Sequence, residues 1–334
     1  MSKISGSYQS VLHIGNTAGV GTLLAKGQRE QGIESRVLMF NEDPYGFGAD
    51  SIVSVRPDWE QLPTKVSDLV GLVNKVVEIQ SCIQDFDILH FHYRSAIDVP
   101  NPFIPRGIDI PLWKIQNKTV VVHFHGSDIR WKGVPEIYRK FADQIIVSSP
   151  DLIKWAPENG IWLPRAIDIQ SIKPCYPNQN NAKITIVHAP TDREIKGTKH
   201  VISAVDSVKQ DNKTVELKII EDVSHKEAVE EYKKADIIVD WVNPEYGLYG
   251  MFGIEGMALG KPVCAYIKPE VKNHLPNSPI IQTSPTTLAD ELSKLISDPY
   301  LRNRIGKKGR KFAQSIHSLD AVINQCLGIY DAIA

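Results

Sequence analysis

The sequence predicts an α/β protein of two domains, each built on a parallel β-sheet that helices cover. Short apolar runs, of the length expected for strands buried on both faces, alternate along the chain with longer segments of helical periodicity. The chain has 334 residues. Because one hydrophobic core rarely serves so many residues, two domains of roughly 150–170 residues each are expected.

In the first half, a strand leads directly into a glycine-rich turn and a helix, and further strands follow at intervals. The expected elements are a strand at Val11–Ile14, a helix ending at Gln31, a strand at Val37–Phe40, a helix at Asp68–Gln84, and strands at Ile88–Phe91, Thr119–Phe124 and Gln144–Ser148.

The second half follows the segment Lys173–Lys183, in which two prolines and a cluster of Asn and Gln residues indicate an interdomain linker. We therefore expect domains at about 1–172 and about 180–317. The expected elements of the second domain are strands at Ile184–Val187, Leu217–Ile220, Ile237–Asp240 and Val263–Ile267, helices at Lys199–Lys209, Lys226–Lys234 and Phe252–Leu259, and helices from Thr287 onward, interrupted near Asp298 and near His317.

Composition narrows the class of protein. The formal net charge is −1, which gives no reason to expect nucleic acid as a partner. The four cysteines are scattered without metal-ligand spacing, as in a reducing compartment. The polar start of the chain lacks the apolar core of a secretory signal, and no apolar run approaches the ~20 residues that span a bilayer. We expect a cytoplasmic protein, with peripheral membrane contact left open.

The most informative segment is Tyr246–Ile267, in which a glycine-bearing loop runs into a helix. Backbone N–H groups at a helix N-terminus favour an anion, so a phosphate near Gly250–Gly253 would be stabilised. One turn later, the carboxylate of Glu255 is placed to accept hydrogen bonds from a ribose diol. The same pattern also fits a tight loop-to-helix connection that binds nothing.

Within this segment, FGIEGMALGKPV resembles the signature of the retaining GT-B glycosyltransferases of family four. The stretches WLPRAIDIQSIKP, ITIVHAPTDREIKGT and DPYLRNRIGKKGRKFA resemble further parts of that family, in the same order. The resemblance implies a GT-B fold: two Rossmann-like domains that face each other across a cleft, with a last helix, in residues 318–334, that returns to the first domain. It also implies a glycosyltransferase that acts in polysaccharide biosynthesis. Such an enzyme moves a sugar from a nucleoside-diphosphate sugar to a glycan, lipid-linked or small-molecule acceptor, which the first domain binds.

The resemblance assigns the donor site. Glu255 corresponds to the glutamate that binds the donor ribose, and the diphosphate is expected to bind at Gly250, Met251, Phe252 and Gly253. The chain departs from the family at Gly247, where the family has a glutamate that contacts the transferred sugar. We expect Glu245 to take over this contact, with Asp240 in reserve.

Two cations follow the strand Ile184–Val187. Arg193 and Lys196 lie in one loop and can neutralise a diphosphate leaving group. The resemblance gives an arginine and a lysine of this loop that role, with Lys196 at the matching position before Gly197. It also implies that transfer needs neither a bound metal nor a cofactor. The alternative is a solvated surface loop.

In the first half, VHFHGSDIR places His125 and Asp128 just beyond a buried strand, where cleft residues of α/β sheets lie. His125 is a candidate catalytic residue that binds the donor sugar or positions the acceptor hydroxyl, as the resemblance also implies, and Asp128 is a candidate sugar or acceptor contact. We expect His123 to point to the opposite side of the strand and pack in the core. A similar pair, His90 and His92, ends the preceding strand. Metal binding by these histidines is an alternative, but their spacing in the sequence matches no known metal site.

The turn after the first strand, GNTAGVG, places Gly19 where the family's loop approaches donor phosphates or acceptor. It does not complete the dinucleotide fingerprint, since the third glycine position is Leu24. With Glu42 near the end of the second strand, a nicotinamide-dependent enzyme remains a minor alternative. A second alternative, supported by Gly247, is a non-catalytic GT-B subunit that binds a sugar nucleotide or a partner glycosyltransferase.

A basic run occurs near the C-terminus. It is interpreted as a solvated helix face rather than a membrane or nucleic-acid site. Its six cations are Arg302, Arg304, Lys307, Lys308, Arg310 and Lys311.

Overall fold

The structure, a computed structural model, describes residues 8–40, 46–53, 76–93, 95–96 and 106–334. The chain divides into two compact units, one formed by residues 1–166 with 322–334 and the other by residues 167–321. Glu42 and the first part of the predicted helix Asp68–Gln84 lie outside the described residues, and a helix is present over residues 76–83.

The first unit contains a parallel sheet with seven described strands, in the order β3-β2-β1-β4-β5-β6-β7. The strands are β1 (Ser10–Ile14), β2 (Glu34–Met39), β3 (Ser51–Ile52), β4 (Ile88–His92), β5 (Thr119–Phe124), β6 (Gln144–Val147) and β7 (Ile161–Trp162). This is the Rossmann order, in which the direction of winding reverses between β1 and β4. That reversal makes the carboxyl ends of β1 and β4 the expected ligand position of this unit.

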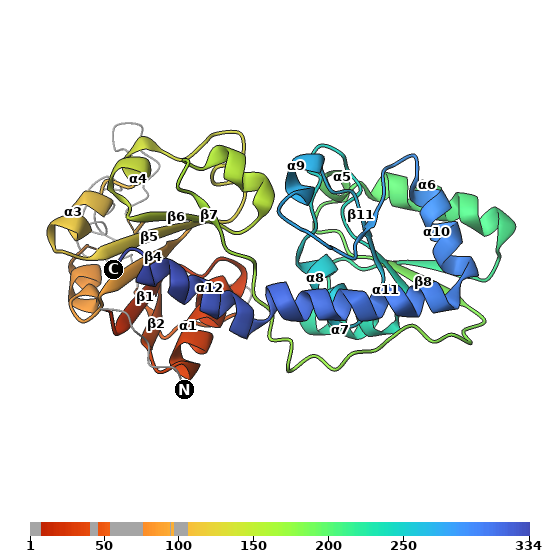
Figure 1. Ribbon diagram of the computed structural model, residues 1–334, viewed down its shortest axis with the longest axis horizontal. Coiled ribbons are helices and arrows are strands. Elements are labelled where there is room, and N and C mark those ends of the chain that lie inside the picture. The colour runs from red at the N-terminus through yellow and green to blue at the C-terminus, as the bar shows by residue number, and fades with distance from the viewer. Residues whose placement is uncertain (1–7, 41–45, 54–75, 94, 97–105) are drawn as a thin grey trace, which may run out of the picture. The chain divides into compact units, whose positions relative to one another are not determined.

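The two faces of this sheet differ in chemistry. One face is apolar and packs against residues 76–83, α3 (Ile110–Ile115) and α4 (Glu136–Phe141). The other lies against α1 (Val20–Glu30) and α12 (Leu319–Asp331), as Figure 1 shows. Residues of α12 from Val322 onward belong to this unit, although they are far from it in sequence.

The second unit contains a parallel sheet with five described strands, in the order β12-β11-β10-β8-β9. The strands are β8 (Ile184–His188), β9 (Val215–Ile219), β10 (Ile237–Val239), β11 (Val263–Ala265) and β12 (Ile281–Gln282). Here the winding reverses between β8 and β10, as in flavodoxin-like sheets.

Helices cover both faces of the second sheet. The helices α6 (Thr198–Asp211) and α10 (Leu288–Ser297) pack on one face through a core of Val, Ile and Leu side chains. The other face of the sheet carries α7 (His225–Lys234), α8 (Met251–Ala258) and α11 (Pro299–Phe312), as Figure 1 shows. Short helices α5 (Arg193–Lys196) and α9 (Pro269–Lys272) complete the unit, and a π-helical turn over Ala313–His317 follows α11.

The predicted α/β class with two Rossmann-like domains is confirmed. The long buried strands lie within one to three residues of their predicted bounds, whereas the edge strands β3, β7 and β12 were not predicted because two-residue runs carry no periodicity. The division between the units falls at residues 166/167, before the predicted linker. The linker's Cys175 N–H donates to the Leu259 carbonyl at 2.8 Å, so this segment packs within the second unit.

The solvated-face interpretation of the basic run is wrong for two of its six cations. Arg302 is only 2% exposed and donates to the carbonyls of Leu295 and Ile296 at the end of α10. Arg310 donates to carbonyls of Ile169 and Ala258. Both guanidinium groups therefore satisfy backbone oxygens that the helix and loop ends leave open. Among the described residues, no helix is both long enough and apolar enough to cross a membrane.

Candidate functional site

In the second unit, polar chemistry gathers at the switch point between β8 and β10, where open α/β sheets bind their ligands. His188, at the end of β8, is fully buried and donates from Nδ1 to the Val239 carbonyl at 2.8 Å. Its Nε2 then accepts from Thr198 Oγ1 at 3.0 Å. Because burial lowers the pKa of His188 to about 4, a neutral imidazole ties β8, β10 and the start of α6 together.

Lys196 is positioned by the two turns that flank the short helix α5. Asp192 caps the helix by accepting from two of its backbone N–H groups at 2.9 Å. Gly197 follows Lys196 in the left-handed region at φ +78°, and a Cβ there would lie 3.0 Å from the backbone nitrogen of Asn243. The sequence Lys-Gly-Thr therefore lets the chain turn into α6 while it approaches the segment after β10.

Lys196 forms a buried ion pair with Asp240, the residue that follows β10. Its Nζ lies 2.7 Å from Asp240 Oδ1, and the exposed fractions of the two residues are 6% and 0%. The second oxygen of Asp240 accepts from the Gly250 N–H at 2.7 Å. Lys196 Nζ also lies 4.4 Å from the centre of the Trp241 ring. This network holds a cation at the start of α8.

The start of α8 presents backbone N–H groups that no side chain caps. Gly250 gives its N–H to Asp240, so the helix geometry leaves the amides of Met251, Phe252 and Gly253 for a ligand. A Cβ on Gly253 would lie 2.7 Å from Asp240 Oδ2, so this glycine is required for the carboxylate to approach the helix. Amides of a first helical turn, the helix dipole and a neighbouring cation are features that favour an anion, and in this structure the carboxylate of Asp240 lies beside them.

Glu255 lies one turn further along α8 and is 9% exposed. Its Oε1 accepts from His225 Nε2, the first residue of α7, at 2.6 Å. The hydrogen bond with Glu255 raises the pKa of His225. The contact engages one carboxylate oxygen, so the other remains able to accept from a ribose hydroxyl.

Arg193 lies in the same short helix as Lys196 but has a different environment. Its guanidinium pairs with Glu221, with Nε 2.9 Å from Oε1, and its side chain is 61% exposed. The structure therefore brings together Lys196, Asp240 and the start of α8, while it places Arg193 with a carboxylate of the loop after β9.

At position 247 the chain has glycine where the family that it resembles has glutamate, and the packing of the loop explains why. Gly247 adopts φ +58°, and a Cβ there would lie 2.2 Å from Cγ of Lys268. The Lys268 side chain also donates from Nζ to the Glu245 carbonyl, while its backbone N–H bonds the Gly247 carbonyl at 2.9 Å. Any side chain at position 247 would displace Lys268, so the loop is built around this glycine. Glu245 itself is exposed in the turn before it.

In the first unit, five buried histidines form one layer on the face that α1 and α12 cover. The expectation that His123 points away from His125 is wrong: residues two apart share a strand face, and the two rings lie 4.3 Å apart. Parallel pairing places His13 beside His90 and His92 beside His123. We refer to these residues as the histidine layer: His13, His90, His92, His123 and His125.

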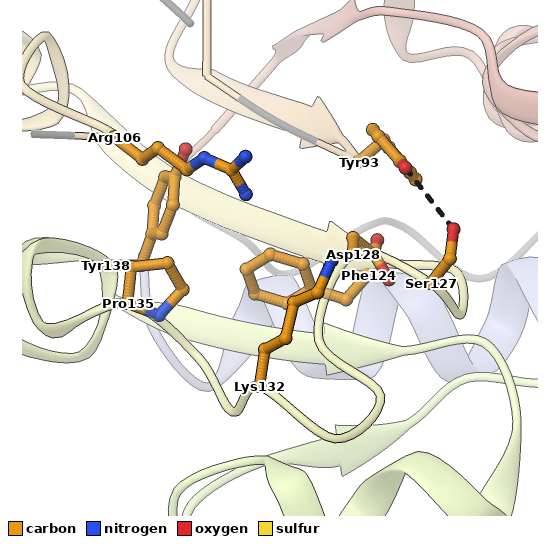
Figure 2. Close-up of a pocket in the computed structure, with 8 residues that line it drawn as sticks. All are labelled: Tyr93, Arg106, Phe124, Ser127, Asp128, Lys132, Pro135 and Tyr138. Atoms are coloured by element: carbon orange, nitrogen blue, oxygen red, sulfur yellow. Dashed lines mark hydrogen bonds between the residues drawn. The ribbon is translucent and has the colours of Figure 1, made fainter. Parts of the chain in front are cut away.

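His125 and Asp128 belong to the tight turn after β5. Both oxygens of Asp128 accept backbone N–H groups of this turn, from His125 and Gly126 at 2.7 Å, so its carboxylate shapes the turn. Burial raises the pKa of Asp128. The residue also lines a small cavity of about 80 Å³, into which the cationic ends of Arg106 and Lys132 extend in Figure 2.

Gly19 precedes α1 in the left-handed region at φ +75°. A Cβ on Gly19 would lie 2.7 Å from Cδ1 of Phe47. The close approach that requires glycine here is therefore to an aromatic side chain.

Several residues at these sites were not predicted from the sequence. Neither Trp241 nor His225 belongs to a sequence motif. Only the folded arrangement brings Trp241 to Lys196 and His225 to Glu255. Trp241 Nε1 is buried and has no hydrogen-bond partner among the residues that the structure describes, beside the start of α8. The histidine layer had a signal, the repeated His-x-His at the ends of β4 and β5, which parallel pairing turns into one cluster.

No protein-family model matches the chain, and no curated protein sequence matches it significantly.

Solved structures match the fold over most of the chain. HepE from Anabaena, solved in complex with UDP and glucose, matches with a TM-score of 0.67 at 14% identity, over 97% of this chain and 100% of HepE. A TarM variant from S. aureus, solved with fondaparinux, α-GlcNAc-glycerol and UDP, gives 0.55 at 15% identity, over 78% of this chain and 59% of TarM. A Listeria monocytogenes protein described as a candidate UDP-N-acetylglucosamine 2-epimerase gives 0.54 at 12% identity, over 96% and 95% of the two chains. The chain therefore shares the GT-B fold of these proteins.

Proposed function

We propose that this chain is a glycosyltransferase that moves a sugar from a nucleoside-diphosphate sugar, with UDP as the first nucleotide to test, to a glycan or a related acceptor. The observation that carries the proposal is the arrangement at the β8/β10 switch point, where a buried Lys196–Asp240 pair meets the uncapped start of α8. HepE and TarM, which share the fold, were both solved with UDP bound.

In the proposed site, the amides of Met251, Phe252 and Gly253 bind the diphosphate, and the ammonium of Lys196 stabilises the charge that develops on the leaving group. Glu255 accepts from the ribose diol through the oxygen that His225 does not use. Because these cationic and dipolar groups come from the protein, we propose that transfer proceeds without a bound metal.

Arg193 can add positive charge near the leaving group only if its ion pair with Glu221 breaks. Its exposed side chain can make this change at little cost, since surface ion pairs contribute about 0–1 kcal/mol. We therefore assign Arg193 a secondary role in leaving-group stabilisation.

On the acceptor side, we propose that His125 contacts the reacting sugars and that Asp128 holds the turn that presents it. Retention of anomeric configuration is proposed on the resemblance of FGIEGMALGKPV to the family-four signature. The acceptor class remains part of the proposal, with glycans placed first because TarM was solved with a glycan and a glycosylated glycerol.

The test begins with a thermal-shift screen of UDP, GDP, ADP and their sugars. A ligand at 100 times its dissociation constant should stabilise the protein by about 2.7 kcal/mol. Donors that bind are then incubated with and without acceptors, and products are separated by mass and by anomeric NMR. Transfer or hydrolysis that releases the nucleotide supports the proposal.

Nucleotide-sugar binding without any turnover would favour the alternative, a non-catalytic GT-B subunit, which the loop built around Gly247 supports. A donor whose sugar is isomerised would point to epimerase chemistry instead.

A further inference from the structure

The histidine layer of the first unit contains more unpaired ring nitrogens than a packed core tolerates. Among the described residues, four buried nitrogens lack a hydrogen-bond partner: His90 Nε2, His123 Nδ1, His123 Nε2 and His125 Nδ1. Each neutral imidazole carries one N–H, and a buried polar group without a partner costs about 1–3 kcal/mol. His90 and His125 each pair their other ring nitrogen, with Tyr330 and His92, whereas His123 has neither nitrogen paired among the described residues. The one N–H of His123 is therefore an unsatisfied buried donor, and a bound ion that takes up the His123 ring is one explanation for it.

We propose that His92, His123 and His125 form a site for a transition-metal ion of the zinc class. One ring nitrogen of each lies within 4.8 Å of the others. His92 Nδ1 and His125 Nε2 are 3.3 Å apart. Two nitrogens at this separation, each about 2.0–2.1 Å from zinc, subtend roughly 105–110° at the metal, which is close to tetrahedral geometry.

A second group, His13, His90 and His92, satisfies the same distance limit, but its nitrogens are held by two hydrogen bonds that are shorter than the 3.3 Å contact between His92 and His125. His13 Nδ1 lies 3.0 Å from His92 Nε2, and His90 Nδ1 lies 2.6 Å from the Tyr330 hydroxyl. Three of the four unpaired nitrogens belong instead to His123 and His125. The metal is therefore assigned to the group at the ends of β4 and β5, the edge at which α/β sheets bind ligands.

His13 supplies the second-shell hydrogen bond that a metal-binding His92 needs. His13 Nε2 lies 2.9 Å from Gln28 Oε1, an acceptor, so this nitrogen carries the proton and His13 Nδ1 is an acceptor. His92 then donates from Nε2 to His13, which leaves His92 Nδ1 with a lone pair. This lone pair faces His125 Nε2 at 3.3 Å, and a metal ion bound by both nitrogens would replace that hydrogen bond.

Charge and protonation are compatible with a cation. Burial is the main cause that holds the pKa values of His92, His123 and His125 well below the usual range, so all three are neutral at pH 7. Arg165 donates to the His125 carbonyl at 3.1 Å, and the carboxylate of Asp128 accepts the His125 N–H at 2.7 Å. The turn therefore carries one positive and one negative group beside the site.

This inference does not depend on the proposed transferase activity. The two proposals share only His125. A metal bound to the His125 ring would compete with any contact between that ring and a sugar, so transfer should be assayed on the protein from which metals have been removed.

The test uses the full chain after removal of metals by chelation. Titration with Co²⁺ should give the intense visible absorption of tetrahedral coordination at one equivalent, and Zn²⁺ should displace it. X-ray absorption of the zinc form should show imidazole nitrogens at about 2.0–2.1 Å. The readouts are absorption and metal stoichiometry, so they stand whether or not sugar transfer is found.

The matched variants are His123→Phe and His90→Phe, which replace one ring of the layer by another of similar shape. We expect His123→Phe to weaken metal binding by about 100-fold or more, because even outer-shell losses cost 10–100-fold. We expect His90→Phe to change it by less than about threefold. If His123→Phe does not fold, His123→Gln takes its place.

Three results would overturn the assignment: no binding by the parent chain, equal binding by His123→Phe and the parent, or loss of binding only in His90→Phe. The last result would move the metal to the group of His13, His90 and His92.

Discussion

The two Rossmann-like units use the same architecture but place different chemistry at corresponding points. At its switch point, the second unit has a buried Lys196–Asp240 pair beside an uncapped helix start, an arrangement for an anion. The first unit has five neutral imidazoles on the face beneath its switch point, and their tightly buried nitrogens favour a metal or a hydrogen-bonding ligand. The fold thus determines where a ligand can bind, while the side chains at the strand ends determine which ligand binds there.

The comparison also shows why the second unit was easier to interpret. An anion site built from a helix start leaves a local record in the sequence, since Gly250 and Gly253 must lack side chains where Asp240 approaches the helix. The histidine layer leaves only the repeated His-x-His of β4 and β5, and the strand pairing that joins these residues into one cluster is not encoded in any short segment.

The largest expected effect concerns Lys196. Removing one member of a buried ion pair costs about 3–5 kcal/mol of stability, so the informative variant is the double change Lys196→Met with Asp240→Asn. We expect it to fold and to lose about 100-fold or more in turnover, since the leaving group loses its cation. Steady-state transfer rates measure the effect.

Two controls accompany this variant. Asp240→Asn alone keeps the cation but removes the carboxylate that holds it, so its stability is measured as well; where it is folded, it should retain more activity than the double variant. Arg193→Ala removes an exposed cation of the same loop, and we expect a loss of at most about tenfold. Parent-like turnover in the double variant would show that the leaving group is stabilised elsewhere.

The next effect concerns Glu255. A hydrogen bond to a charged acceptor contributes about 1.5–3 kcal/mol, so Glu255→Ala should weaken UDP binding by roughly 10- to 100-fold. Titration calorimetry measures this change. His225→Ala is the matched control, because it leaves the carboxylate in place while it removes its protein partner. Identical UDP affinity in Glu255→Ala and the parent would rule out the ribose contact.

A pH effect follows from His188. Its folded-state pKa is about 4, below the ordinary value of 6.5, so the unfolded chain binds a proton that the folded chain does not. The free energy of unfolding is therefore unaffected by His188 above about pH 6.5 and decreases as the pH falls toward 4. At pH 5 the decrease is about 2 kcal/mol.

We expect His188→Asn, which lacks the titrating ring, to lower stability at pH 7 but to show a smaller further loss between pH 7 and pH 5. Urea unfolding at the two pH values gives the comparison. A parent-like pH dependence in the variant would exclude His188 as a source of acid sensitivity.

The smallest expected effect concerns Glu245. If this carboxylate contacts the transferred sugar, Glu245→Gln keeps an acceptor but loses its charge, and turnover should fall about fivefold. Binding of bare UDP should stay unchanged. A parent-like rate with every accepted donor would end the idea that Glu245 replaces the family's glutamate.

The sequence was informative where structure depends on local chemistry. The long strands have unbroken apolar runs, and the start of α8 has the glycines that its contacts require, so both could be predicted. The partners of the site residues could not. Lys196 and Asp240 meet because β10 lies next to β8, and His225 reaches Glu255 because α7 lies near α8; neither relation is encoded in any short segment.

Two sequence interpretations failed for identifiable physical reasons. The prediction for His123 was wrong because side chains alternate along a strand with a period of two, so His123 and His125 lie on the same face of the sheet. The basic run was treated as one solvated face, but Arg302 and Arg310 are drawn inward by helix-end and loop carbonyls that need donors.

The proposed function requires that the nucleotide bind at the β8/β10 switch point of the second unit. Amide hydrogen exchange of the full chain, with and without saturating UDP, tests it most directly. We expect slower exchange at the amides of residues 250–256 and in the segment that carries Lys196, with little change in the Gly15–Gly21 turn. Slower exchange confined to the Gly15–Gly21 turn, with none at the start of α8, would contradict it and would favour a dinucleotide-type site in the first unit.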